Sequence, residues 1–219
     1  ITAVSEDLKS ETLEHFNIKN EIKSIPNFID MSLYQQEDDM KLRNRFAKKE
    51  EFILTHISNF RKVKRVEDVI KIFNKVHKEV PAKLLMIGDG PERLKVEQLC
   101  RKLGICDKVK FLGKLKVIEK MLSITDIFIL PSERESFGLV ALEAMASKSV
   151  VISTNSGGLP EVNKDGYTGF LSDVGDVKKM SKDLSSLLSN TQLLNEMKEN
   201  AFEHAKSFDL PVVLPKYEE

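Results

Sequence analysis

The sequence has no tryptophan and only two cysteines, Cys100 and Cys106, in 219 residues. No histidine lies near either cysteine at the spacing of a zinc site, and a chain of this length can bury a core without disulfide bonds. We therefore expect two ordinary thiols and no metal centre. No apolar run is long enough to cross a bilayer, and the first residues lack the basic and apolar regions of a signal peptide. These absences favour a cytoplasmic protein.

Charge of one sign is not in excess, since Lys plus Arg and Asp plus Glu each total 34. The chain as a whole therefore gives no reason to expect nucleic acid as a partner. Hydrophobic residues make up 41% and charged residues 31%, which is the composition of an ordinary globular protein and not of a disordered or fibrous one. The length predicts one main domain with a short leader.

Short apolar runs, each bounded by Gly, Pro, Asn or Ser, alternate with amphipathic segments along most of the chain. This alternation is typical of parallel β-α-β units. The runs predict six strands, at residues 52–57, 83–87, 109–112, 127–130, 150–152 and 169–171.

The segments between these runs carry apolar residues at helical spacing. Residues 66–76 form one predicted crossover helix, and another starts at Pro91 and ends near Leu103, with Gly104 past its end. A third helix begins near Gly138, and two terminal helices follow around residues 180–188 and 193–201. The pattern predicts an α/β fold with a doubly wound parallel sheet of six strands.

The ends of the chain depart from this alternation. Ser5 can cap a helix that runs from Glu6 to about Phe16, and residues 22–26 are expected to be an extended linker. Because no initiator Met precedes them, we interpret residues 1–30 as the end of a preceding domain and a linker. The main domain is then 31–205 and the C-terminal tail 206–219. The strongly charged residues 35–49 predict a solvated helix or an insertion.

Residues 130–146 run from a strand through a loop into the helix that starts near Gly138. In an open parallel sheet, ligands bind beyond the carboxyl ends of the strands, which is where this loop must lie. Free backbone N–H groups at the helix start favour an anion such as phosphate. Glu143 lies on an otherwise apolar helix surface, where a carboxylate needs hydrogen-bond donors such as sugar hydroxyls. A partly exposed or lysine-paired carboxylate is the alternative.

A basic loop, residues 58–65, directly follows the first strand of the predicted sheet and contains Arg61, Lys62, Lys64 and Arg65. Arginine can bind phosphate oxygens in pairs and lysine acts as a point charge, so the loop is a candidate cradle for a diphosphate. A solvated surface loop is the alternative.

The Gly88-Asp89-Gly90-Pro91 segment is a turn between a predicted strand and a predicted helix. It begins like a dinucleotide fingerprint, but the third glycine is absent, which argues against NAD as a ligand.

The pattern Glu135-x7-Glu143, with Ser136-Phe137-Gly138 between the two acids, resembles the motif of the retaining glycosyltransferases of family four. Those enzymes have two Rossmann-like domains of the GT-B type and an active site in the cleft between them. The resemblance spans nearly the whole chain, which corresponds to the C-terminal, donor-binding half.

The resemblance assigns roles to this motif. It implies that Glu135 contacts the donor sugar and that Glu143 holds the ribose hydroxyls. Backbone amides of the segment from Ser136 through Phe137, Gly138 and Leu139 are expected to approach the sugar and the diphosphate.

The resemblance also implies a phosphate-binding lysine, matched by Lys64, that stands five residues after an arginine. Asn59 occupies the arginine position here, so we infer that Arg61 supplies the second charge and counts with Lys64 and Glu135 as catalytic. Lys114 matches a stretch whose backbone reads the uracil edge. No metal and no cofactor are expected.

One departure concerns the turn after the predicted site helix. Relatives commonly have Gly and Pro where Lys148 and Val150 stand, which places the conformation of that turn in question.

Within the family, the basic loop is most similar to the branch that transfers N-acetylglucosamine from UDP-N-acetylglucosamine to L-malate in bacillithiol synthesis. The resemblance thus implies a UDP-sugar donor, a small-molecule acceptor and the cytoplasm, and it leaves a homo-oligomer open. The acceptor-binding domain would precede this chain, so we expect the chain alone to bind donor and transfer little sugar. A nucleotide-binding module without catalysis and a UDP-N-acetylglucosamine 2-epimerase are alternatives, and the Glu135-x7-Glu143 pattern argues against the second.

Overall fold

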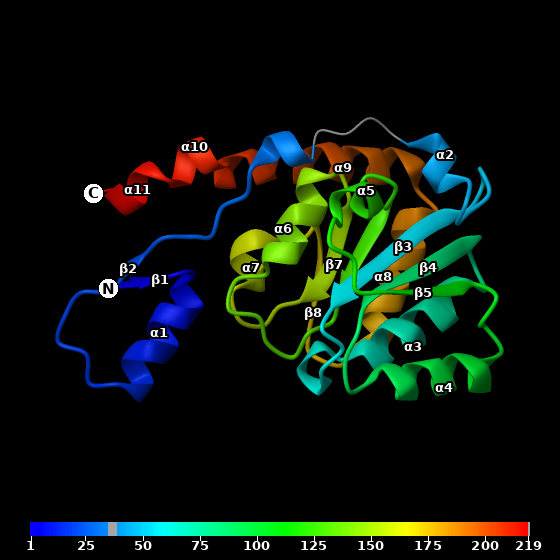
Figure 1. Ribbon diagram of the computed structural model, residues 1–219, viewed down its shortest axis with the longest axis horizontal. Helices are drawn as coiled ribbons and strands as arrows, with labels where there is room; N and C mark the ends of the chain where they lie inside the picture. Colours follow the sequence, from blue (N-terminus) through cyan, green and yellow to red (C-terminus); the bar gives the residue numbers. More distant parts are fainter. Residues whose placement is uncertain (35–38, 219) are drawn as a thin grey trace.

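The computed structural model describes residues 1–34 and 39–218, and its centre is a parallel sheet of six strands in the order β5-β4-β3-β6-β7-β8 (Figure 1). The strands are β3 (Phe52–Ser58), β4 (Ala82–Gly88), β5 (Val109–Gly113), β6 (Ile127–Leu130), β7 (Val150–Thr154) and β8 (Gly169–Ser172). Each lies within two residues of its predicted bounds, and all neighbours pair in parallel. The predicted α/β fold is confirmed.

The sheet grows outward from β3 in two directions. The chain first adds β4 and β5 on one side, then returns to place β6 beside β3 and continues to β7 and β8. The loops that leave β3 and β6 therefore diverge, which makes this edge the topological switch point where such sheets bind ligands. These two loops are the ones that the sequence selected.

Five longer helices cover the two faces of the sheet: α3 (Val66–Val76), α4 (Arg93–Leu103), α6 (Leu139–Ala146), α8 (Val177–Leu188) and α9 (Thr191–Ala205). Successive strand residues point to opposite faces. Leu54 and Ile127 share one apolar cluster with α3, α4 and α8, whereas Phe128 and Val151 share another with α6 and the end of α9. None of the helices in the described part of the chain is long and apolar enough to span a membrane.

Helix boundaries differ from the prediction where the helices are short. α4 begins at Arg93 and not at Pro91, while Gly104 follows it with a left-handed φ of 70°, as expected. The sequence predicted neither α5 (Glu119–Leu122) nor α7 (Leu159–Val162) as a helix. Four residues are too few to show a helical period.

The leader forms a small unit of its own. β1 (Thr2–Ala3) pairs in parallel with β2 (Lys23–Ser24), and α1 (Glu6–His15) lies between them in the chain. Ser5 caps α1 as predicted, since its side chain accepts a hydrogen bond from the N–H of Leu8. The two-stranded sheet was not predicted, because strands of two residues show no alternation.

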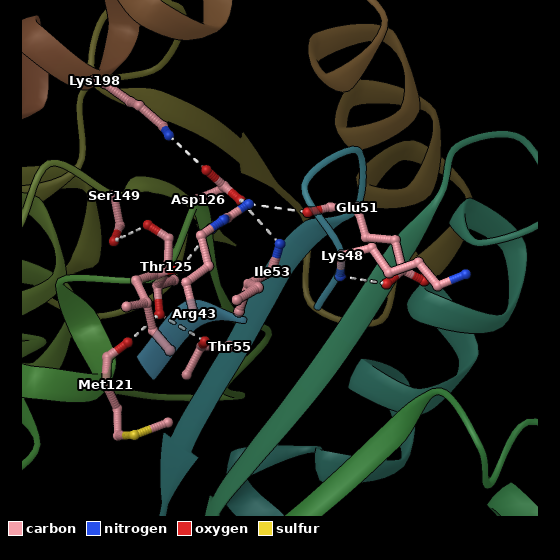
Figure 2. A network of polar contacts seen from close by, with 11 residues as sticks. Arg43, Lys48, Glu51, Ile53, Thr55, Met121, Thr125, Asp126, Ser149 and Lys198 are labelled. Carbon is pink, nitrogen blue, oxygen red and sulfur yellow. Dashed lines mark hydrogen bonds and ion pairs between the residues drawn. The ribbon is translucent and has the colours of Figure 1, made fainter. Parts of the chain in front are cut away.

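The charged segment after the linker is anchored to the sheet by largely buried ion pairs (Figure 2). Arg43, on α2 (Met40–Arg43), places Nη2 2.9 Å from Oδ2 of Asp126, and Nζ of Lys198 lies 2.7 Å from Oδ1 of the same carboxylate. Burial alone would raise the pKa of Asp126, but Lys198 and Arg43 outweigh it and the pKa is lowered. Part of the segment predicted as solvated is therefore fixed, and residues 35–38 lie outside the described residues.

The C-terminal segment returns to the linker. It contains η3 (Lys206–Phe208), α10 (Leu210–Val213) and α11 (Pro215–Glu218), and in Figure 1 it runs from α9 back toward the leader. The N–H of Ile29 donates to the carbonyl of Phe208 (3.0 Å), and the N–H of Leu210 donates to the carbonyl of Ile29 (2.8 Å). The C-terminal segment thus holds the linker through backbone hydrogen bonds on both sides of Asp209. The predicted domain boundaries stay a prediction.

The turn between α6 and β7 holds a lysine in a conformation that favours glycine. Lys148 has a φ of 59°, in the left-handed region, at the position where the family resemblance leads us to expect glycine. Its Nζ lies 2.8 Å from Oε1 of Glu199 and 5.0 Å from the ring centroid of Phe202. Both contacts hold the side chain of Lys148 against α9.

Candidate functional site

The loop after β6 is held at the carboxyl edge of the sheet by backbone hydrogen bonds to its neighbours. The N–H of Glu133 donates to the carbonyl of Val63 (2.7 Å), and the N–H of Gly158 donates to the carbonyl of Glu135 (2.8 Å). A Cβ at Gly157 would lie 2.1 Å from the Glu135 carbonyl oxygen, so only glycine permits this approach. The loops after β3, β6 and β7 therefore form one connected unit.

Glu135 and Lys64, both predicted site residues, form an ion pair at the switch point. Nζ of Lys64 lies 2.7 Å from Oε1 of Glu135, and the hydroxyl of Ser132 donates to the same oxygen at 2.7 Å. Only 21% of the Lys64 side chain and 13% of the Glu135 side chain are exposed, so the pair is largely withdrawn from water. Both bonds are to Oε1, and none of the described residues bonds to Oε2 of Glu135, so Oε2 can bind a ligand.

The other cations of the loop after β3 differ in their surroundings. Arg65 pairs with Asp68 at the start of α3, with 2.7 Å between Nε and Oδ2, so the fold uses this charge. Arg61 and Asn59 are exposed, and their side chains make no hydrogen bond or ion pair within the part of the chain described. The loop therefore offers Lys64 and Arg61 as charges for an anion, while Lys62 is exposed to solvent.

A buried histidine that the sequence analysis did not select supports this loop from below. Nδ1 of His56 lies 2.8 Å from the carbonyl oxygen of Ile129, and Nε2 lies 2.8 Å from Oγ of Ser58. Because a carbonyl can only accept, we assign the proton to Nδ1, so Nε2 accepts from the Ser58 hydroxyl. Oγ of Ser58 in turn accepts from the N–H of Phe60, whose φ of 41° starts the loop. The sequence signal that could have selected His56 is its place as a polar residue within the mostly apolar strand β3.

The burial of His56 makes the stability of the protein depend on pH. Burial lowers the pKa of His56 from 6.5 to about 4, although the hydrogen bond to Ile129 opposes the change. Between these two pH values the unfolded chain binds a proton that the folded chain does not. The free energy of unfolding should therefore be highest above pH 6.5 and fall by about 1.4 kcal/mol per pH unit from this residue alone as the pH drops toward 4.

Urea unfolding at pH 7.5, 6 and 5 measures this effect against a His56→Gln variant. His77 and His204, whose pKa values burial also lowers, remain in both proteins and provide the common background. The variant should be less stable at pH 7.5 and show a shallower loss on acidification. If the free energy of unfolding changed equally with pH in the two proteins, the lowered pKa of His56 would be contradicted.

The start of α6 is open toward the same edge. Gly138 begins the helix with a φ of 96°, and no side chain caps it. This left-handed conformation favours glycine, and a Cβ there would also lie 2.6 Å from Cδ2 of Leu159. Phe137 is buried, whereas Ser136 and Leu139 are exposed. Uncapped amides at this helix start suit an anionic ligand.

The leader contacts this loop directly. The hydroxyl of Ser5 donates to the carbonyl of Ser136 at 2.7 Å. The carboxylate of Glu161 accepts from the backbone N–H groups of Glu6 and Asp7, at 3.0 Å each, where a negative charge also stabilises the helix dipole of α1. The segment that precedes the main domain therefore lies against the candidate site.

Glu143 lies on α6 and is partly buried, with Oε1 accepting a hydrogen bond from the phenol of Tyr34 at 3.1 Å. Burial raises the pKa of Glu143, the Tyr34 hydrogen bond opposes this, and the like charge of Glu119 adds to it. Among the described residues no lysine or arginine pairs with Glu143, so the lysine-paired alternative does not hold.

The remaining candidate residues lie on the loops after β4 and β5. Lys114 directly follows β5 and is exposed. A Cβ at Gly88 would lie 1.8 Å from the carbonyl oxygen of Ser58, and one at Gly90 would lie 2.0 Å from the carbonyl oxygen of Asn59. These two glycines therefore allow the loop after β4 to pack on the loop after β3.

In the structure, some of the predicted site residues are in direct contact, and the others lie on the same or neighbouring loops and helices without touching the ion pair. Glu135 and Lys64 touch, and Asn59 and Arg61 share the loop of Lys64. Glu143 and Lys114 lie on α6 and after β5, and the structure gives no direct contact between them and the ion pair. In residues 1–34 and 39–218, no group of three His, Cys, Asp or Glu side chains is placed to hold a metal ion. The absence of a metal requirement stays a prediction.

A doubly wound parallel sheet with an ion pair and an uncapped helix start at its switch point defines a Rossmann-like domain. The chain belongs to the family described as glycosyl transferases group 1, which matches residues 38–204.

Individual relatives agree with this assignment. The chain is 44% identical over 220 residues to the N-acetyl-alpha-D-glucosaminyl L-malate synthase of Bacillus anthracis, covering 100% of this chain and 58% of that protein. It is 32% identical over 177 residues to the uncharacterized glycosyltransferase MJ1607 of Methanocaldococcus jannaschii, covering 77% of this chain and 45% of that protein.

Solved structures share the fold. The crystal structure of Anabaena Alr3699/HepE in complex with UDP and glucose superposes with a TM-score of 0.92 at 24% identity, over 99% of this chain and 61% of that one. The chain thus spans less than two thirds of the length of each of these proteins. The expected resemblance to GT-B glycosyltransferases is confirmed.

Proposed function

We propose that this chain is the donor-binding half of a retaining glycosyltransferase that uses UDP-N-acetylglucosamine and transfers the sugar to L-malate in bacillithiol synthesis. The observation that carries the proposal is the Lys64–Glu135 pair at the switch point. The choice of donor and acceptor is supported by the 44% identity, over the whole chain, to the N-acetyl-alpha-D-glucosaminyl L-malate synthase of Bacillus anthracis.

The diphosphate of the donor would bind between the basic loop and the start of α6. As the bond to the sugar breaks, negative charge grows on the leaving diphosphate, and cations already in place stabilise that charge without reorganising. Lys64, Arg61 and the uncapped amides near Gly138 supply this stabilisation. No metal is required for it.

The two acids hold opposite ends of the donor. Glu135, fixed by Lys64, uses its free oxygen to bind a sugar hydroxyl, and Glu143 accepts hydrogen bonds from the ribose. The backbone beside Lys114 meets the uracil edge. The acceptor site would lie in the part of the longer protein that faces this edge, and the reaction would take place in the cytoplasm.

Calorimetry of the full-length protein with UDP-N-acetylglucosamine, UDP-glucose and GDP-mannose tests the donor assignment, followed by turnover with L-malate and with other hydroxy acids. We expect UDP-N-acetylglucosamine to bind most tightly and L-malate to be the best acceptor, with the α-linked product. Binding without transfer to any acceptor would favour a non-catalytic module. Failure to bind any UDP-sugar would refute the proposal.

A further inference from the structure

Tyr34, a residue of the linker, reaches the candidate site from outside the sheet. It directly follows η1 (Met31–Leu33), where Asp30 accepts a hydrogen bond from the N–H of Ser32 at 3.0 Å. Its ring belongs to the buried apolar cluster that includes Leu122 and Phe137, and only 7% of the residue is exposed. The position of the phenol is therefore set by packing.

The linker itself is fixed by the end of the chain. Oδ1 of Asp209 accepts a hydrogen bond from the N–H of Met31 at 3.1 Å, next to the two backbone bonds of Ile29 described above. Two segments far apart in the sequence thus place Tyr34 over α6.

The hydrogen bond from Tyr34 leaves most of the Glu143 carboxylate free. Burial raises the pKa of Tyr34 and the charge of Glu143 adds to this, so the phenol stays a neutral donor. A carboxylate has about four lone-pair sites on its two oxygens, and Tyr34 occupies one of them, on Oε1. The remaining sites suffice for two neighbouring hydroxyl groups.

Glu119, at the start of α5, has the opposite effect to Tyr34 on the pKa of Glu143. Its like charge raises the pKa of Glu143, and its own Oε2 is buried with no hydrogen-bond partner in the described part of the chain. The other elements against α6 present apolar residues to it, such as Phe128 of β6 and Ala201 of α9. Among the described residues, Tyr34 and Glu119 are therefore the two polar groups that shift the pKa of Glu143.

We propose that Tyr34 is a positioning residue for the donor nucleotide: its hydroxyl holds the Glu143 carboxylate, ionised and oriented, for the two ribose hydroxyls, against the repulsion of Glu119. The proposal rests on the proposed function, in which Glu143 binds the ribose. Nucleotide affinity then depends on the linker and on the C-terminal segment that clasps it.

Two substitutions should have opposite effects on the pH dependence of binding. Tyr34→Phe removes the donor that favours the ionised carboxylate, so protonation of Glu143 weakens binding at a higher pH than in the wild type. Glu119→Gln removes the like charge, so binding persists to a lower pH. If Tyr34 and Glu119 only supported the fold, the two substitutions would not shift the pH dependence of binding in opposite directions.

The test measures affinities of the full-length wild type and both variants for UDP and for 2′-deoxy-UDP by calorimetry between pH 5 and 8. We expect Tyr34→Phe to bind UDP at least about threefold more weakly at the acidic end, which is the size of one lost hydrogen bond, and to approach the wild type at pH 8. The loss should be smaller for 2′-deoxy-UDP, which lacks one ribose hydroxyl. Glu119→Gln should bind UDP more tightly than the wild type at the acidic end.

The outcomes separate the two proposals. If the wild type binds UDP but Tyr34→Phe weakens UDP and 2′-deoxy-UDP equally at every pH, the positioning role is overturned and the function stands. If the wild type binds neither nucleotide, the proposed function fails. In that case a ¹³C NMR titration of the Glu143 carboxyl, assigned with Glu143→Gln, still decides the coupling: titration midpoints unchanged by both substitutions would overturn it.

Discussion

Replacing Lys64 with alanine should lower kcat/KM of the full-length enzyme by about a hundredfold or more. The ammonium group is the only cation paired with Glu135 among the described residues, and the pair is largely buried, where one preorganised charge contributes about 10²- to 10³-fold to a rate. Steady-state kinetics with UDP-N-acetylglucosamine and L-malate measure the loss. Arg61→Ala should reduce donor binding comparably, because we propose that Arg61 takes the role of the arginine whose position Asn59 occupies.

Lys62→Ala is the matched control for Lys64→Ala. Lys62 lies on the same loop and is exposed, so its removal should change kcat/KM by less than about threefold. Urea unfolding of each variant separates lost function from lost folding, because Lys64→Ala also leaves the Glu135 carboxylate without its partner. Near-normal turnover by a folded Lys64→Ala enzyme would show that the diphosphate is stabilised elsewhere, and unchanged donor affinity in Arg61→Ala would assign that role to another residue.

Replacing Asp126 with alanine should have the largest effect on stability. The substitution leaves Arg43 and Lys198 without their common partner and removes the acceptor of the Ile53 N–H, which lies 2.9 Å from Oδ2 (Figure 2). Removing one partner of a buried ion pair costs roughly 3 kcal/mol or more. For a protein of this size that corresponds to a fall in Tm of at least about 6 °C.

Differential scanning fluorimetry and urea unfolding measure this loss, and Asp183→Asn provides its control. Asp183 pairs with Lys179 on the surface of α8, with side-chain exposures of 21% and 45%, so the change should cost less than about 1 kcal/mol. Similar costs in the two variants would mean that the Asp126 pairs contribute no more than a surface pair. Loss of stability in Asp126→Ala with normal donor binding in the folded fraction would agree with its place at the far edge of the sheet.

The central sheet could be predicted because buried parallel strands are short continuous apolar runs, such as residues 127–130. The alternation of those runs with helical periods also predicted the two loops of the site, since in such folds the loops after particular strands must meet. Gly138 and Gly104 marked a helix start and a helix end correctly, through conformations that few other residues adopt.

The contacts that complete the site could not be predicted, because they join residues far apart in the sequence. Lys64 and Glu135 are 71 residues apart, and Tyr34 and Glu143 are 109 apart. No local pattern encodes such pairs, and a resemblance to a motif supplies the role of a residue but not its partner. His56 was not selected for the same reason, because its role depends on its contact with Ile129 on the neighbouring strand.

The turn at Lys148 shows how a departure from a family pattern can leave the structure intact. The backbone keeps the left-handed conformation that suits glycine, and the side chain gains contacts with Glu199 and Phe202 that glycine could not make. The sequence signalled a change at this position, and only the structure shows which contacts the lysine side chain makes there.

The most direct test of the account is a crystal structure of the full-length protein with UDP-N-acetylglucosamine bound. The account predicts ribose hydroxyls within hydrogen-bond distance of Glu143, the diphosphate between Lys64, Arg61 and the start of α6, and a sugar hydroxyl on Glu135. At the opposite edge of the sheet, a cavity of about 390 Å³ is lined by Arg43, Asp126 and Lys198 among others. A nucleotide bound there, with Lys64 and Glu135 free of ligand, would contradict it.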